Sequence, residues 1–187
     1  MSALFLPPPP RRPPSAAPAA IMPLVAVLRQ LRDLLLGMSD EQYRARPAGL
    51  PGSVGGHVRH CLDHVAALLG ALDSSSLDYD RRQRGTDVET RRAAALAAIE
   101  LQTRQLLDVP TGVEGRPLRL SVIVSSDAAP VVVETTVGRE MAFVLSHTIH
   151  HNALIGVLAA ALGVPLPERF GYAPSTIAHL EKAKCAR

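Results

Sequence analysis

The sequence contains no tryptophan, and Phe, Tyr and Trp together make up only 3% of its 187 residues. It has two cysteines, Cys61 and Cys185, which are too few for a disulfide framework, so a reducing compartment is expected. No uninterrupted apolar run approaches the ~20 residues that span a bilayer. These absences predict a soluble, cytoplasmic protein that does not associate with membranes.

A strong excess of charge of one sign is also missing. The 20 basic and 17 acidic residues leave a formal net charge of +3 at pH 7. Proteins that bind nucleic acid need a one-sided basic face, and this composition does not supply one. We therefore expect no nucleic-acid partner.

Apolar residues, in contrast, are plentiful. They make up 47% of the chain, and alanine and leucine dominate them, which is typical of helix bundles. The length suits one domain with a sizeable core.

Residues 1–22 form a separate segment with seven prolines and no acidic residue. Such a segment cannot form a packed element, so we expect a disordered tail over 1–22 and a single domain over 23–187. The tail also contains arginine and serine, as organelle transit peptides do, but it lacks their amphipathic helical pattern.

Apolar residues recur at helical spacing in four stretches, which span about residues 24–37, 54–72, 86–109 and 137–162. Ser53 is expected to cap the second helix, and Pro110 to follow the end of the third. Two β-branched runs, RPLRLSVIVSS and PVVVETTV, are joined by DAAP and predict a hairpin. We therefore predict an all-α fold: an up-and-down four-helix bundle with a β-hairpin inserted before the last long helix and a short C-terminal helix in APSTIAHLEKAK.

Five of the seven histidines fall on apolar faces of two predicted helices. His147 and His151 are one turn apart in HTIHH, and His57, His60 and His64 lie together in GHVRHCLDH. Buried imidazoles need partners for both nitrogens, so gathering five of them for packing alone is costly. A shared divalent metal would remove this cost, because neutral imidazole is a common metal ligand.

An H-x-x-x-H pair and one histidine from a facing helix provide three ligands and leave coordination positions open. Open positions are typical of catalytic or exchangeable metal sites. The alternative is a histidine-rich bundle without a metal, in which each imidazole is satisfied by backbone or carboxylate groups.

The pairing of SVGGHVRHCLDH with the later HTIHHNALI resembles the DinB/YfiT-like superfamily of metal-binding four-helix bundles. The resemblance covers roughly Leu24 to Leu162. It implies one divalent metal ion held by His60, which is followed by Asp63 in HCLD, and by His147 and His151. Zinc, nickel and iron fit three imidazoles equally well.

The helical wheel provides an alternative to His60. His64 lies nearer the apolar stripe of its helix than His60 does, so it is the alternate ligand from that helix. His150 falls on a neighbouring face and is not a ligand by this match.

The resemblance also suggests functions. Some members of this superfamily are transferases that use low-molecular-weight thiols such as bacillithiol or mycothiol, so a metal-dependent thiol S-transferase or a hydrolase-like enzyme is one expectation. A low-molecular-weight thiol or another small molecule would then be the partner. The alternative is a non-catalytic metal-binding sensor or interaction scaffold. A homodimer is compatible with either function.

Two acidic residues lie near the predicted ligands. Glu140 precedes His147 by two turns on the same face, so it is a candidate hydrogen-bond partner of a ligand, fourth ligand or general base. It is also explained as a first-turn acid favoured by the helix dipole. Asp63 is a candidate to orient His60, or a solvated surface charge.

Overall fold

The computed structural model describes residues 18–81 and 84–185, and most of the predicted tail lies outside this part of the chain. The first helix, α1 (Ile21–Leu36), begins two residues before the predicted domain boundary. Pro23 fits there because a proline in the first turn of a helix gives up no intrahelical hydrogen bond.

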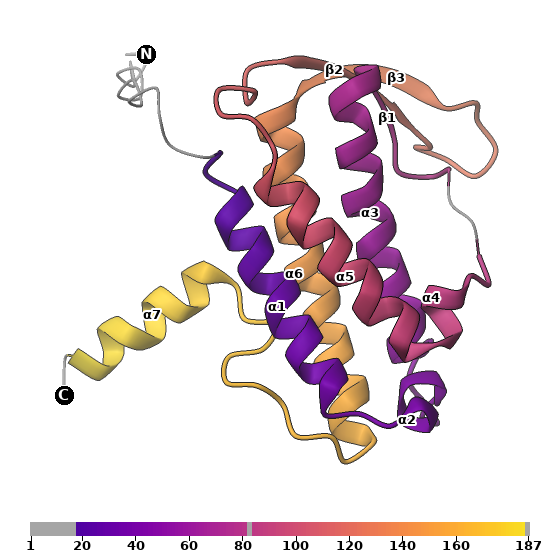
Figure 1. Cartoon of the computed structure of the whole chain (residues 1–187), viewed down its shortest axis with the longest axis vertical. Helices are drawn as coiled ribbons and strands as arrows, with labels where there is room; N and C mark the ends of the chain where they lie inside the picture. The colour runs from indigo at the N-terminus through magenta and orange to yellow at the C-terminus, as the bar shows by residue number, and fades with distance from the viewer. Residues whose placement is uncertain (1–17, 82–83, 186–187) are drawn as a thin grey trace, which may run out of the picture.

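Four long helices form the bundle: α1, α3 (Val54–Ser74), α5 (Arg92–Leu107) and α6 (Val137–Ala161). In cross-section the order is α1, α5, α3, α6, so that α3 contacts α5 and α6, and α1 contacts the same two helices (Figure 1). The three remaining helices within the described residues are α2 (Asp40–Arg44), α4 (Asp87–Thr90) and α7 (Pro174–Cys185). The predicted bundle, hairpin and C-terminal helix are confirmed.

The helix directions differ in one respect from the up-and-down order that the sequence predicts. α3 and α5 run parallel, because the chain returns along the bundle after α3 and begins α5 at the end where α3 begins (Figure 1). α4 packs there against the first turn of α3, where a Cβ on Gly55 would lie 2.1 Å from the carbonyl oxygen of Glu89. The predicted third helix is divided into α4 and α5, since the backbone of Arg91 is extended.

Local signals explain where the two histidine-bearing helices begin. The hydroxyl of Ser53 accepts a hydrogen bond from the backbone nitrogen of Gly56 at 3.1 Å, so the predicted cap of α3 is confirmed. Thr136 caps α6 in the same way by accepting from the backbone nitrogen of Arg139 at 3.3 Å. The caps therefore fix the start of α3 a few residues before His57, and the start of α6 a few residues before Glu140.

The hairpin consists of β2 (Pro117–Val122) and β3 (Val131–Thr136), which pair antiparallel. A third strand, β1 (Ser76–Asp78), pairs parallel with β2 and completes a small sheet at one end of the bundle (Figure 1). The sequence did not predict β1, because three residues are too few to show a strand pattern. Leu77 and Leu118 are buried and connect this sheet to the core.

α6 is the one helix, within residues 18–81 and 84–185, that is long and apolar enough to cross a membrane by length and composition. The core helix of a globular protein passes the same test. α6 packs against α1 and α3 here, and its buried residues include Glu140 and Asn152. The buried apolar side chains of α6 therefore pack within the bundle.

Candidate metal centre

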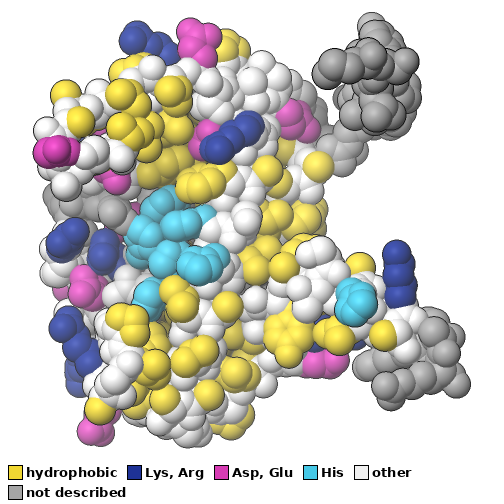
Figure 2. Space-filling view, turned by 180° about the vertical axis from the view of Figure 1, so that it is seen from behind, with side chains coloured by type: hydrophobic (Ala, Val, Ile, Leu, Met, Phe, Trp, Pro, Cys, Tyr) yellow, Lys and Arg dark blue, Asp and Glu magenta, His cyan; other side chains and the backbone are white. Residues whose placement is uncertain are grey.

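The histidines gather where α3 and α6 lie side by side in opposite directions. His57, His60 and His64 occupy successive turns of α3, and His147 and His151 occupy successive turns of α6. Because the two helices are antiparallel, histidine rings of α3 lie opposite histidine rings of α6 along the contact between them. Figure 2 shows histidine side chains collected in one patch on the surface, with hydrophobic side chains beside it.

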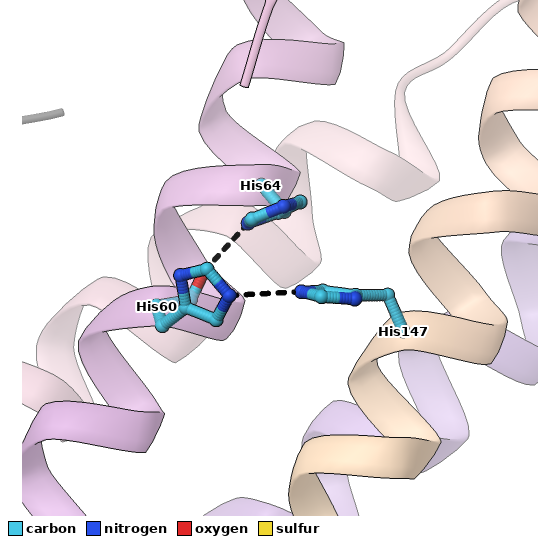
Figure 3. Close-up of side chains that lie close together, drawn as sticks. All are labelled: His60, His64 and His147. Carbon is cyan, nitrogen blue, oxygen red and sulfur yellow. Dashed lines mark hydrogen bonds between the residues drawn. The ribbon is translucent and has the colours of Figure 1, made fainter. Parts of the chain in front are cut away.

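Three of these imidazoles form a group that could hold a metal ion: His60, His64 and His147. One ring nitrogen from each lies within 4.8 Å of the others. The Nε2 atoms of His60 and His147 are 3.0 Å apart, and Figure 3 shows these rings facing each other from opposite helices. Two nitrogen ligands of a tetrahedral zinc ion lie about 3.3 Å apart, because Zn–N bonds are about 2.0–2.1 Å long. The spacing therefore fits a shared ion after a small adjustment.

The backbone determines which nitrogen of His64 is a ligand candidate. Nδ1 of His64 lies 2.9 Å from the carbonyl oxygen of His60 (Figure 3). A carbonyl oxygen only accepts hydrogen bonds, so Nδ1 carries the proton in the neutral ring and Nε2 carries the lone pair. Metal-bound histidines commonly donate their other N–H to a carbonyl in this way.

The sequence predicted that the five imidazoles lie on buried faces, and this is wrong for four of them. His64 is 5% exposed, whereas His57, His60, His147 and His151 are only partly buried. The reason is that these imidazoles lie along the contact between the neighbouring helices α3 and α6, at the surface of the bundle and not at its centre (Figure 2).

His151, the third ligand predicted from the family resemblance, lies beside this group. Its ring centroid is 4.5 Å from that of His60 and 4.6 Å from that of His147. Its Nδ1, however, lies 2.9 Å from Nδ1 of His57. Burial, and then the neighbouring imidazoles with His147 first, lower the pKa of His151 to about 3, so the ring is neutral at pH 7. Its assignment as a ligand stays a prediction.

Glu140 does not lie among the imidazole nitrogens. Its carboxylate is fully buried and accepts hydrogen bonds from the hydroxyls of Tyr79 (2.9 Å) and Thr135 (2.7 Å). Arg139 adds an ion pair at 2.9 Å. The carboxylate is thus engaged with its own donors, which disfavours its predicted roles as fourth ligand or general base. Burial and the negative charge of Glu140 raise the pKa of Tyr79, so its hydroxyl stays protonated and donates.

Two aromatic residues, which have no recognisable sequence motif, complete the site. Tyr79 stacks on His64, with ring centroids 4.8 Å apart and planes 12° apart, and Phe143 stacks on His147 at 5.4 Å. Tyr79 directly follows the short strand β1. Phe143 precedes His147 by one helical turn, a spacing that indicates a shared face.

Two other groups near the ligands have different partners. Asp63 accepts a hydrogen bond from Nη1 of Arg59 at 2.6 Å, in an ion pair one turn apart on α3. The thiol of Cys61 is buried in the core, and burial raises its pKa to about 12. A protonated, buried thiol is a poor metal ligand, so the candidate donors are imidazoles.

The fold and these imidazoles define a helical bundle with a three-histidine group that could bind a metal. Residues 24–155 match the family model of the DinB superfamily, and the chain belongs to this superfamily. The family resemblance and the fold predicted from the sequence are therefore confirmed.

Two individual proteins are also similar to this chain. The crystal structure of the DinB-like protein YjoA from Bacillus subtilis superposes with a TM-score of 0.59 at 17% identity, covering 81% of this chain and 97% of that one. The sequence is 33% identical over 108 residues to FK506-binding protein 5 of Rhizopus delemar. That match covers 57% of this chain but 28% of the fungal protein, so most of the relative has no counterpart here.

Proposed function

We propose that this protein binds one divalent transition metal through His60, His147 and a third imidazole, and uses it to activate a low-molecular-weight thiol for transfer to an electrophile. A bound metal ion would lower the pKa of the thiol and stabilise its thiolate. The observation that carries the proposal is the convergence of imidazole nitrogens at a partly buried position between α3 and α6. An all-imidazole donor set suits zinc, nickel or iron better than magnesium or calcium.

Two residues compete for the place of the third ligand. His64 is favoured by its position within 4.8 Å of the other two donors and by its hydrogen bond to the backbone. His151 is favoured by the family resemblance; its Nδ1 lies 2.9 Å from Nδ1 of His57, so Nε2 is its candidate ligand atom. Either choice gives three protein ligands and leaves room for an exogenous one.

The surroundings of the imidazoles support a small ligand with an anionic group. Phe143 and Tyr79 form an aromatic wall beside His147 and His64. The guanidinium of Arg139 lies 5.3 Å from the centroid of Phe143, and its side chain is 61% exposed. A cation at this position could attract the carboxylate of a thiol cosubstrate, although it also pairs with Glu140.

Metal content tests the site. The protein is purified, reconstituted separately with zinc, nickel and ferrous iron, and analysed by elemental mass spectrometry. We expect about one equivalent of metal, with strong loss in His60→Ala and His147→Ala and in one of the two variants His64→Ala and His151→Ala. His179→Ala is the matched control, because His179 is exposed on α7. No bound metal after reconstitution would refute the proposal.

Thiol binding tests the proposed reaction. The cobalt(II) form is titrated with bacillithiol, mycothiol or cysteine, and a thiolate–cobalt charge-transfer band in the near ultraviolet is expected to appear. Turnover is then measured as loss of free thiol in the presence of an alkylating electrophile. A metal-loaded protein that shows neither a band nor turnover would refute the transferase proposal but not the metal site.

The alternative function, a non-catalytic metal sensor or interaction scaffold, is supported by a cleft whose described lining includes no histidine. A cleft of about 650 Å³ runs along α3 between Asp63 and Ser74, and none of the described residues that line it is a histidine. Glu140 is also fully engaged by neighbouring donors. A metal-loaded protein that is more stable than the apo form but binds no thiol would favour a sensor or scaffold.

A further inference from the structure

A histidine outside the proposed ligand set connects the loop before α3 to the candidate metal centre. His57 lies near the start of α3, and its Nδ1 is 2.9 Å from Nδ1 of His151 on α6. Its Nε2 lies 3.4 Å from the carbonyl oxygen of Pro51. Gly52 follows with a φ of 79°, which glycine adopts readily, and a Cβ on Gly52 would lie 3.4 Å from Nε2 of His57. The carbonyl and the two rings thus form a row of hydrogen-bonding groups that leads from this loop to α6.

The carbonyl oxygen at one end of this row assigns the protons in it. Because a carbonyl oxygen only accepts hydrogen bonds, Nε2 of a neutral His57 carries the proton, and Nδ1 carries the lone pair. Nδ1 of His57 is then the acceptor, so Nδ1 of His151 is the donor. A neutral His151 that is protonated on Nδ1 has its lone pair on Nε2. The hydrogen bond to His57 therefore leaves Nε2 of His151 as the atom free to bind a metal.

The arrangement of the rings is compatible with this role. The ring centroid of His151 is 4.5 Å from that of His60 and 4.6 Å from that of His147. The ring planes are inclined by 73° and 64°, so His151 is not stacked face to face on either ring. Imidazole lone pairs lie in the ring plane, and inclined rings can direct them at a common point. His151 is thus placed beside both proposed ligands, with His57 behind its Nδ1.

We propose that His57 is a positioning residue that accepts a hydrogen bond from Nδ1 of His151 and so keeps Nε2 of His151 unprotonated and available as a metal ligand. This inference rests on the proposed metal site and adds two groups outside the ligand set, His57 and the carbonyl of Pro51. Metal-bound histidines commonly donate their other N–H to a carboxylate, a carbonyl or a water. Here an imidazole takes that place, and a backbone carbonyl fixes the tautomer of that imidazole. His57 acts through His151 and does not touch the metal.

The tautomer of His151 tests the inference without a metal. Long-range proton–nitrogen NMR spectra of the apo protein, with isotope-labelled histidine, distinguish a ring protonated on Nδ1 from one protonated on Nε2, and His151→Ala assigns the signals. We expect His151 to be protonated on Nδ1 in the wild type and to lose this preference in His57→Leu. Leucine should be tolerated at this position, because the other residues lining the pocket of about 60 Å³ beside His57 are apolar: Leu50, Pro51, Leu154, Val157 and Leu158.

Metal affinity tests the consequence for the site. Cobalt(II) dissociation constants are measured by competition with a chromophoric chelator, and His57→Leu should weaken binding about 10–100-fold, as loss of an outer partner of a ligand typically does. His57→Asn places an amide oxygen near the position of Nδ1, so it should recover most of this affinity. In a His151→Ala background His57→Leu should have no further effect. His150→Leu is the matched control, because His150 is exposed on α6 next to His151, and it should leave the affinity unchanged.

The outcomes distinguish this inference from the site itself. A wild-type protein that binds no metal would refute the proposed function, together with the role of His151 as a ligand. A wild type that binds metal no more tightly than His57→Leu would leave the site but overturn the role of His57, and so would an apo wild type with His151 protonated on Nε2. Equal weakening by His57→Leu in the presence and absence of His151 would show a general structural effect and also overturn the inference.

Discussion

Gly55 and Gly70 lie in the same helix, α3, but a side chain at each would meet different surroundings. A Cβ on Gly55 would come within 2.1 Å of the carbonyl oxygen of Glu89 and 2.8 Å of the ring of Tyr43. A Cβ on Gly70 would meet nothing within 4 Å. The pair Gly55→Ala and Gly70→Ala therefore tests whether close approach of α4 holds the first turn of α3.

The expected magnitudes follow from these contacts. Gly70→Ala should stabilise the protein by about 0.5–1 kcal/mol, because alanine loses less backbone entropy in a helix. Gly55→Ala can gain at most a similar amount, and it must also displace a backbone carbonyl. Overpacking of this kind costs about 1–3 kcal/mol, so Gly55→Ala should be less stable than Gly70→Ala by at least that amount.

Urea unfolding followed by circular dichroism measures both variants against the wild type, with thermal unfolding as a second assay. For a domain of this size, 1 kcal/mol shifts the melting temperature by about 2–4 °C, so the two variants should differ by about 2–12 °C. If Gly55→Ala is as stable as Gly70→Ala, α4 does not pack as closely on α3 as described, and the argument for the connection between α3 and α5 fails.

Three other predictions concern single groups. In a Cys185→Ser background, the protonated, buried thiol of Cys61 should not react with thiol reagents at pH 8 until the protein unfolds; rapid labelling of native protein would contradict its burial. The apo protein should lose stability as the pH falls from about 6.5 towards 3, because the unfolded chain protonates His151 before the folded one does; this slope in urea midpoints should shrink in His151→Asn, and an unchanged slope would exclude His151 as its source. Ser53→Ala should cost about 1 kcal/mol in unfolding free energy, since Ser53 caps α3, whereas Thr86→Ala should cost little, since Thr86 makes no side-chain cap; equal effects would refute the assignment of the cap.

Features of the fold that depend on residues close together in the sequence could be predicted from it. Ser53 and the apolar stripe that follows it define α3 within a few residues, and the β-branched runs define the hairpin. The direction of α5 relative to α3 could not be predicted, because it depends on the contact between Gly55 and Glu89, which are distant in sequence. The short strand β1 depends in the same way on its pairing with β2.

The residues of the candidate site also divide into those that a sequence pattern identifies and those whose role depends on contacts in the folded protein. His60 and His147 could be singled out from spacing and family resemblance, and the structure brings their Nε2 atoms together. The contribution of His64 depends on a backbone hydrogen bond, and that of Tyr79 on stacking across the site, so neither has a sequence pattern. Glu140 could be identified as unusual, but only its three donors explain why it is buried.

The separation of the ligands along the chain has a consequence for biosynthesis. His60 and His147 meet across 87 residues of sequence. At about 5–20 residues per second, a ribosome needs roughly 4–17 s to add that length, so His60 is made long before its partner exists. A cation held between these residues would close a loop whose entropy cost is about 4 kcal/mol. Metal capture would therefore be a late step that joins the first half of the newly made chain to the last long helix.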